Sequence, residues 1–88
     1  MTQQEANAKM VTHGMFVRKE DGGERANFSK CDISGLNFSG EDLHGAIFSG
    51  ANCAGCYFLD ADLTDTDFVG AILDDAEMDG AFVEGMKR

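Results

Sequence analysis

The amino-acid sequence predicts a stacked coil of five-residue blocks, and three observations support this fold class. From Ala26 to Gly85 the chain divides into twelve consecutive blocks whose third residue is always apolar. The first residue is small in ten of the twelve blocks, and the last is glycine in eight. A fixed internal period indicates a stacked, quasi-one-dimensional fold. Because glycine tolerates the backbone angles of tight turns, we expect each block to end at a corner.

A second period of twenty residues lies on top of the first and predicts a coil with four sides. Every fourth block carries similar side chains at its third position, so like residues would lie on like in successive layers. Such layers interdigitate without cavities. The four predicted columns are Phe28, Phe48 and Phe68; Ile33, Cys53 and Leu73; Phe38, Phe58 and Met78; and Leu43, Leu63 and Val83.

The blocks also follow a recognisable pattern of residue types. The block ADLTD (residues 61–65) fits A-(D/N)-L-x-x, and ANFSK (residues 26–30) differs from it only by Phe at the third position. In this the sequence resembles the pentapeptide-repeat family, over about two thirds of the chain. The resemblance implies an all-β fold, a right-handed quadrilateral β-helix with twenty residues per coil. Residues 26–85 would then form about three coils.

Residues 1–25 lie outside the repeat and predict a helical cap. The Thr-x-x-Glu spacing at residues 2–5 is that of a capping box, so we expect a helix from about Gln3 to about Arg18. The Asp-Gly-Gly turn signal at 21–23 ends it. Because repeat arrays need caps over their open ends, we expect this helix and turn to cover the first coil.

The C-terminal end of the repeat has less sequence after it. Residues 86–88 are expected to form a short tail. Phe82 occupies the second position of its block, which should face outward. An exposed aromatic on an open edge indicates either a small cap or an association site. Phe82, Val83 and Met86 would accordingly fold over the last coil or pair with a second molecule, giving a monomer or a weak dimer through the C-terminal coil.

The net charge of −9 is unequally divided along the chain. Residues 1–30 have a net charge of +1, whereas residues 31–86 contain twelve Asp or Glu and no Lys or Arg. Strands in a sheet lie about 4.8 Å apart, so three coils rise about 15 Å. The same length of duplex DNA carries about nine charges. We therefore expect a uniformly acidic rod with a charge density at least that of DNA.

This charge density predicts a non-enzymatic inhibitor that mimics a short DNA duplex. Its partner would be a DNA-binding protein or complex with a basic cleft, with no direct nucleic-acid or membrane contact. The resemblance has a similar implication, because some pentapeptide-repeat proteins are DNA mimics that engage type II topoisomerases. The acidic residues expected to gather on one edge of the rod and contact the partner are Asp42, Asp60, Asp62, Asp65, Asp67 and Glu84.

Several partner classes and one different function remain open at this point. A rod about 15 Å tall spans about four base pairs, which suits the site where a CRISPR surveillance complex reads its short motif. Phage-encoded inhibitors such as anti-CRISPR proteins form a class that blocks such sites. The alternatives are a topoisomerase-interacting protein and a structural or scaffolding module whose acidic surface serves solubility alone. Without a visible signal peptide or membrane span, we expect a cytoplasmic location, in the host if the protein is phage-encoded.

Metal, cofactor and catalytic sites are not expected. Cys53 and Cys56 have C-x-x-C spacing, yet the register places both inward with Cys31, as small core residues. The acidic run from Asp60 to Asp67 lacks the glycine and glutamate that a calcium loop requires. A convex rod offers no cleft for acid or base catalysis. The sequence therefore predicts a binding protein rather than an enzyme.

Overall fold

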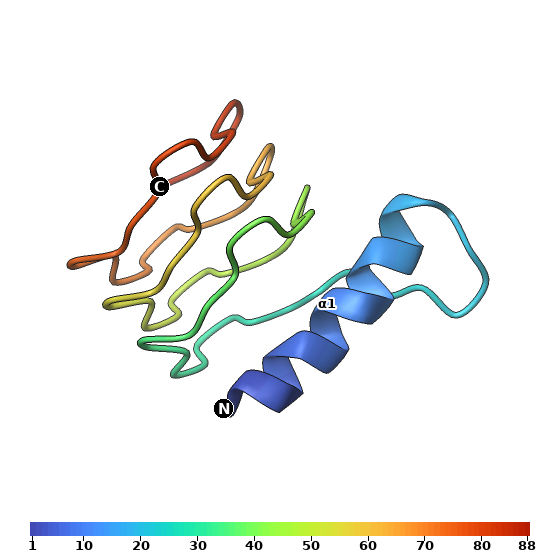
Figure 1. Cartoon of the computed structure of the whole chain (residues 1–88), viewed down its shortest axis with the longest axis horizontal. Coiled ribbons are helices and arrows are strands. Elements are labelled where there is room, and N and C mark those ends of the chain that lie inside the picture. Colours follow the sequence, from blue (N-terminus) through green and yellow to red (C-terminus); the bar gives the residue numbers. More distant parts are fainter.

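The computed structural model describes all 88 residues, which form one helix followed by a four-sided coil (Figure 1). Helix α1 spans Gln3–Val17. A loop leads to Asn27, the first residue of the coil that pairs with the next layer. It forms a parallel bridge with Ile47, and eight further bridges join residues that lie twenty positions apart. Each side contributes one isolated bridge per layer rather than a longer strand.

Hydrogen bonds between the layers follow one scheme on every side. The N–H of Phe28 donates to the carbonyl of Ile47 over 2.7 Å, and the N–H of Ile47 donates to the carbonyl of Ala26 over 3.0 Å. At the corner, the N–H of Lys30 donates to the carbonyl of Ser49 over 2.9 Å. The stacking of layers therefore satisfies backbone groups that a single coil would leave unpaired.

Every block ends in a residue with left-handed backbone angles, which makes the corner. Eight of these residues are glycines with φ between 67° and 75°. The other four have φ between 57° and 60°, and three of them are aspartates, which tolerate this region better than most residues. They are Lys30, Asp60, Asp65 and Asp75.

The interior of the coil is a stack of phenylalanine rings, as the twenty-residue period predicts. Phe48 lies between Phe28 and Phe68, with ring centroids 5.0 Å and 4.6 Å apart and nearly parallel planes. Phe38 stacks on Phe58 at 5.2 Å in the neighbouring column. Rings of the two columns meet edge to face at 5.5–5.9 Å, a preferred arrangement for aromatic pairs.

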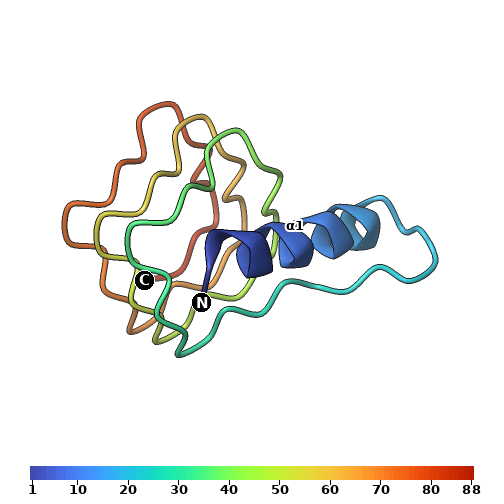
Figure 2. The ribbon, with the colours of Figure 1, turned by 60° about the horizontal axis from the view of Figure 1, so that its bottom comes forward.

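Helix α1 begins with the predicted capping box and lies across the end of the first coil (Figure 2). The Thr2 hydroxyl accepts a hydrogen bond from the N–H of Glu5 over 3.1 Å, and the Glu5 carboxylate accepts one from the N–H of Thr2 over 2.7 Å. The helix ends at Val17, one residue before the expected boundary. Its length and polarity are not those of a membrane-spanning helix. Ala6, Met10 and His13 form its buried face.

Polar groups at the start of the chain and on α1 bond to the backbone of the first coil. The Gln3 amide donates to the carbonyl of Asn37 over 2.9 Å and accepts from its N–H over 2.8 Å. The amino group of Met1 donates to the carbonyl of Asp32 over 3.2 Å. His13 contacts the carbonyl of His44 over 2.9 Å. These groups occupy hydrogen-bond positions that a preceding coil would fill.

The repeat continues past Gly85, so the expectation of a tail at residues 86–88 is wrong for residues 86 and 87. Lys87 forms a parallel bridge with Asp67, and its N–H donates to the carbonyl of Thr66 over 2.9 Å. Met86 packs against the core. The repeat continues here because the third coil still offers free backbone groups and because Met86 fits the first position of a block.

The last coil leaves its outer face uncovered. Phe82 is 64% exposed and Val83 is 42% exposed, so these two residues do not fold over the end. Leu73 and Met78 are only half-buried, whereas the corresponding residues of earlier coils are buried. Of the three residues expected to fold over the last coil or to pair with a second molecule, Met86 packs against the core, whereas Phe82 and Val83 stay exposed.

Candidate acidic binding surface

One side of the coil carries more carboxylates than any other, and we call it the acidic side. It consists of residues 41–45, 61–65 and 81–85, whose second residues Asp42, Asp62 and Phe82 pair in successive layers. The acids on this side, which contains no Lys or Arg, are Glu41, Asp42, Asp62, Asp65 and Glu84.

Four of the six predicted contact residues belong to the acidic side, namely Asp42, Asp62, Asp65 and Glu84. Asp60 lies at the corner that precedes this side. Asp67 lies on the next side, where it pairs with Lys87. The acidic side thus brings most of the predicted set together, whereas Asp67 lies on a different side, in the layer next to that of Lys87.

Charge is unequal around the coil, which corrects the expectation of a uniformly acidic rod. The side formed by residues 26–30, 46–50, 66–70 and 86–88 has a net charge of +2, because Lys30, Lys87 and Arg88 outweigh Asp67. The acidic side has a net charge of −5, and the two remaining sides have −3 each. The difference arises because the basic ends of the repeat fall on one side.

The second-position carboxylates also hold their own blocks in shape. One oxygen of Asp62 accepts hydrogen bonds from the N–H of Thr64 over 3.0 Å and from its hydroxyl over 2.5 Å. Asp42 accepts from the N–H of His44 over 3.1 Å, and Asp67 from the N–H of Val69 over 3.0 Å. The same bond is made by every other Asp or Asn at the second position: Asn27, Asp32, Asn37 and Asn52.

Sequence reasoning missed this structural role, although seven of the twelve blocks signal it with Asp or Asn at the second position. Such side chains bond to the backbone two residues on and stabilise turns. Partial burial opposes ionisation of Asp62, but the bonds from Thr64 and the nearby His44 outweigh it and lower the pKa of this carboxyl. Asp62 is therefore both a surface charge and part of the repeat's internal bonding.

Asp60 and Asp65 occupy corners and extend toward the last coil. Their φ angles are 58° and 59°. A Cβ atom on Gly80 or Gly85, twenty residues further on, would collide with the carboxylate of the aspartate in the layer before it. The two glycines thus make room for the two carboxylates, a relationship between layers that the sequence pattern did not reveal.

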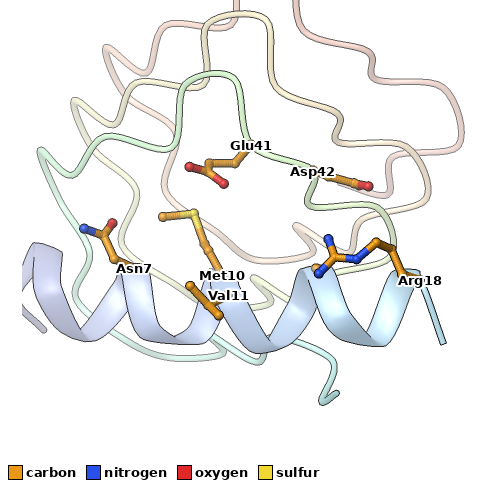
Figure 3. Close-up of a pocket in the computed structure, with 7 residues that line it drawn as sticks. Asn7, Met10, Val11, Arg18, Glu41 and Asp42 are labelled. Carbon is orange, nitrogen blue, oxygen red and sulfur yellow. The ribbon is translucent and has the colours of Figure 1, made fainter. Parts of the chain in front are cut away.

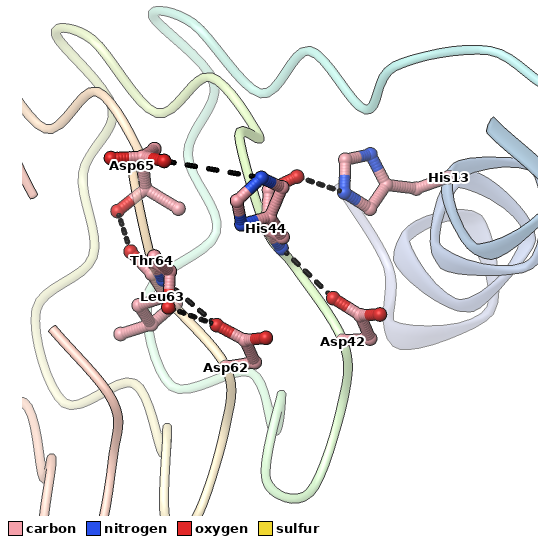
Figure 4. A network of polar contacts seen from close by, with 8 residues as sticks. His13, Asp42, His44, Asp62, Leu63, Thr64 and Asp65 are labelled. Carbon is pink, nitrogen blue, oxygen red and sulfur yellow. Dashed lines mark hydrogen bonds and ion pairs between the residues drawn. The ribbon is translucent and has the colours of Figure 1, made fainter. Parts of the chain in front are cut away.

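The carboxylates of the coil have few charged partners. The chain has two ion pairs: Arg18 with Glu20 at 2.8 Å, outside the coil, and His44 with Asp65 at 3.9 Å, which requires a protonated imidazole. Figure 4 shows His44 between Asp42 and Asp65 on the acidic side. No Lys or Arg forms an ion pair with a coil carboxylate, and the acidic side itself contains neither residue.

A groove of about 370 Å³ separates α1 from the acidic side (Figure 3). Met10 and Val11 supply its apolar wall, while Glu41 and Asp42 supply carboxylates at its opposite edge. Arg18 also lines it, but its guanidinium is bound to Glu20. Glu41 is one of the two first-position residues that are not small, and the groove lies beside this departure from the repeat.

The cysteines lie where the register predicts. Cys53 and Cys56 are fully buried and Cys31 is half-buried. The Cys56 thiol donates to the carbonyl of Ile33 over 2.9 Å. The hydrogen bond with Cys56 and burial both raise the pKa of Cys53. No group of His, Cys, Asp or Glu side chains in the structure has the arrangement of a metal site.

Comparison with known proteins identifies the coil. A family model for pentapeptide repeats matches residues 26–65 and 46–85. The structure is similar to the pentapeptide repeat protein Rfr23 of the cyanobacterium Cyanothece 51142, with a TM-score of 0.66 and 24% identity over 69% of this chain and 42% of that one. It is also similar to a pentapeptide repeat protein of the Arabidopsis thaliana thylakoid lumen, with a TM-score of 0.50 and 33% identity over 66% of this chain and 43% of that one. No curated protein matches the sequence.

These matches agree with the observed four-sided architecture. The likeness covers less than half the length of either solved protein, and the one to Rfr23 concerns the fold alone. The coil is a right-handed quadrilateral β-helix, as the family and the solved structures imply. Because the family model covers more than half of the sequence and the layers repeat with its period, this chain is a member of the pentapeptide-repeat family.

Proposed function

We propose that this protein is a non-enzymatic binding module whose acidic side occupies a basic DNA-binding site on another protein. The observation that supports this function is the excess of negative charge on the acidic side, which carries five carboxylates and no Lys or Arg. Ordinary soluble surfaces intersperse charges of both signs. A one-signed array complementary to a basic cleft speeds association and excludes partners of like charge.

The groove beside α1 extends this surface and suits a long basic side chain. Met10 and Val11 offer an apolar wall against which the aliphatic part of a partner's lysine or arginine packs. Glu41 and Asp42 line the same groove, where they would contact the charged end of that lysine or arginine. This arrangement supports a protein partner with exposed basic residues.

The size of the coil favours a partner that reads a short stretch of duplex. Three layers rise about 15 Å, the length of about four base pairs. We propose the motif-reading site of a CRISPR surveillance complex as the partner of matching size, which would make the protein a phage-encoded inhibitor acting in the host cytoplasm. A type II topoisomerase is the alternative partner.

The test neutralises charge without disturbing the repeat. Asp42, Asp62 and Asp65 are replaced together by Asn, which keeps the acceptor that binds His44 or Thr64 and tolerates the left-handed corner at Asp65. Lysine is not used, because at positions 42 and 62 it would have no oxygen to accept the hydrogen bonds from the N–H groups of His44 and Thr64. The matched control replaces three acids of another side by Asn, namely Asp32, Asp74 and Asp75.

Both variants and the wild type are immobilised, exposed to host lysate, and eluted with a short DNA duplex. We expect the wild type and the control to release DNA-binding proteins, and the acidic-side variant to capture few of them. Raising the salt from about 0.1 M to 1 M should also release them, because the Debye length falls from about 10 Å to 3 Å. The proposal would be contradicted if both variants captured equally fewer DNA-binding proteins than the wild type. It would also be contradicted if the DNA duplex did not displace the captured proteins.

A second candidate function is association through the uncovered last coil. Phe82 and Val83 are exposed there, and Leu73 and Met78 are only half-buried. The acids at this end, Asp74, Asp75, Glu77, Asp79 and Glu84, outnumber the bases Lys87 and Arg88, so two copies meeting end to end would repel each other. Self-association should therefore strengthen with salt, whereas binding through the acidic side should weaken. Sedimentation at low and high salt separates the two functions.

A further inference from the structure

His13 is the buried histidine that joins α1 to the coil. Its side chain is fully buried, and it lies on the face of α1 that also carries Ala6 and Met10. Figure 4 shows it approaching the segment of the acidic side that carries His44. The imidazole contacts two backbone groups that belong to different parts of the first coil.

The two contacts require opposite roles of the two ring nitrogens. The N–H of Ala26 donates to Nδ1 over 2.9 Å, so Nδ1 must carry a lone pair. Nε2 lies 2.9 Å from the carbonyl oxygen of His44, which can only accept, so Nε2 must carry the proton. Both bonds exist together only in the neutral imidazole with hydrogen on Nε2.

A second proton would break this arrangement. It would sit on Nδ1 and face the N–H of Ala26, leaving two donors opposed in a buried position. Burial and the nearby charges of Arg25 and His44 oppose a positive imidazole, while the bond to the His44 carbonyl and the charge of Asp42 favour it. Burial outweighs the others, and the pKa of His13 is lowered from its ordinary value.

We propose that His13 is an acid-sensitive latch that holds α1 on the first coil when neutral and releases it when protonated. Release would free the carbonyl of His44 on the acidic side and widen the groove that separates Glu41 and Asp42 from α1. The second and third coils would stay folded, because their layers are held by bonds in which α1 takes no part. The latch does not depend on the identity of any binding partner.

The direction of the pH effect follows from the two states. With α1 docked, His13 binds a proton less readily than it does when released. The docked state is therefore fully stable above the ordinary histidine pKa of about 6.5, and it loses stability as the pH falls below that value. Of the two α1 side chains that bond to the backbone of the first coil, Gln3 has no titratable group, so His13 is the one that gains a charge on acidification.

The test is native-state hydrogen exchange, followed by NMR at about pH 7.5 and about pH 5. After correction for intrinsic exchange, we expect protection of the Ala26 amide and of α1 to fall about tenfold or more at the lower pH. Protection of the layer between the second and third coils, such as the amide of Phe48, should stay unchanged. Retention of α1 protection at the lower pH would overturn the proposal.

Two variants identify the titrating group. His13→Gln can accept from Ala26 and donate to His44 without titrating, so its α1 protection should not depend on pH. His44→Gln is the matched control and should keep the wild-type pH dependence, since only the backbone of His44 contacts His13. If lowering the pH reduced the protection of α1 as much in His13→Gln as in the wild type, the proposal would be overturned.

If His13→Gln does not fold as the wild type does, the wild-type imidazole decides the question. Its ¹⁵N shifts should show hydrogen on Nε2 at neutral pH, with a titration midpoint below about 6.5 that coincides with the loss of Ala26 protection. The proposal would be overturned if the neutral imidazole carried its hydrogen on Nδ1. It would also be overturned if the imidazole titrated at a pH different from that at which the Ala26 amide loses protection.

Discussion

The two ends of the coil are built from the same repeat but differ in how their outer layer is covered. At the first coil, Phe28 and Ile33 are fully buried, and Gln3 and His13 bond to the backbone. At the last coil, Val83 is 42% exposed, and the N–H groups of the third-position residues Leu73, Met78 and Val83 donate no hydrogen bond within the chain.

This difference shows what the repeat can and cannot supply. Each layer satisfies the layer next to it, so stability inside the stack comes from nearest neighbours. An end layer has no neighbour on one face and depends on a different element to bury it. Helix α1 is that element for the first layer, whereas none of the 88 residues covers the last one.

The largest expected effect comes from breaking the middle of the stack. Phe48→Asp places an unpaired carboxylate between the rings of Phe28 and Phe68, whose centroids lie 5.0 Å and 4.6 Å from that of the Phe48 ring. The cost is several kcal/mol, comparable with the ~5–15 kcal/mol that stabilises a small domain. We expect loss of the native circular dichroism spectrum and of the melting transition. Phe82→Asp, at a residue that is 64% exposed, is the control and should stay folded. A native melting curve for Phe48→Asp would show that the ring stack is not the core.

A smaller effect compares the interior with the open end directly. Leu63 and Leu73 both occupy the third position of a block, but Leu63 is fully buried and Leu73 is half-buried. Leu63→Ala should lower the free energy of unfolding by about 2–5 kcal/mol, and Leu73→Ala by about 1–2 kcal/mol. Urea unfolding measures both. Equal losses would mean that something covers the last layer in solution, and dependence on protein concentration would identify it as a second copy.

The smallest effect concerns corners at the two ends. Gly35 and Gly85 have φ angles of 74° and 72°, so alanine at either costs about 1 kcal/mol. A Cβ atom at Gly35 meets nothing within 4 Å, whereas one at Gly85 meets the carboxylate of Asp65, which must rotate away. We expect Gly85→Ala to cost about 0.5 kcal/mol more, and Asp65→Gly to remove this excess in a double-mutant cycle. If Gly85→Ala still cost more than Gly35→Ala in the Asp65→Gly background, the extra cost would not come from the Asp65 carboxylate.

Much of the coil could be predicted because its determinants recur at fixed spacing. The stacking of Phe28, Phe48 and Phe68 follows from their twenty-residue separation, and the corners follow from glycine or aspartate at the fifth position. The capping box of α1 is equally local, since Thr2 and Glu5 are three residues apart. Local geometry and a constant period leave few alternatives for such residues.

The bonds of the second-position carboxylates were also visible in principle. Asp62 and Thr64 are two residues apart, and the preference for Asp or Asn at this position signals a side chain that accepts from the backbone. Reading these acids only as surface charge overlooked that role. The unequal charge of the four sides was likewise contained in the sequence once the register had been assigned.

The remaining features depend on residues that are distant along the chain and have no fixed spacing. Period and composition determine the layers, the columns and the corners, because each layer repeats the geometry of the one before it. They do not determine that His13 bonds to Ala26 and His44, or that Gln3 pairs with Asn37. Those contacts arise where the repeat stops, and there each partner is selected by packing and by the need to satisfy exposed backbone groups.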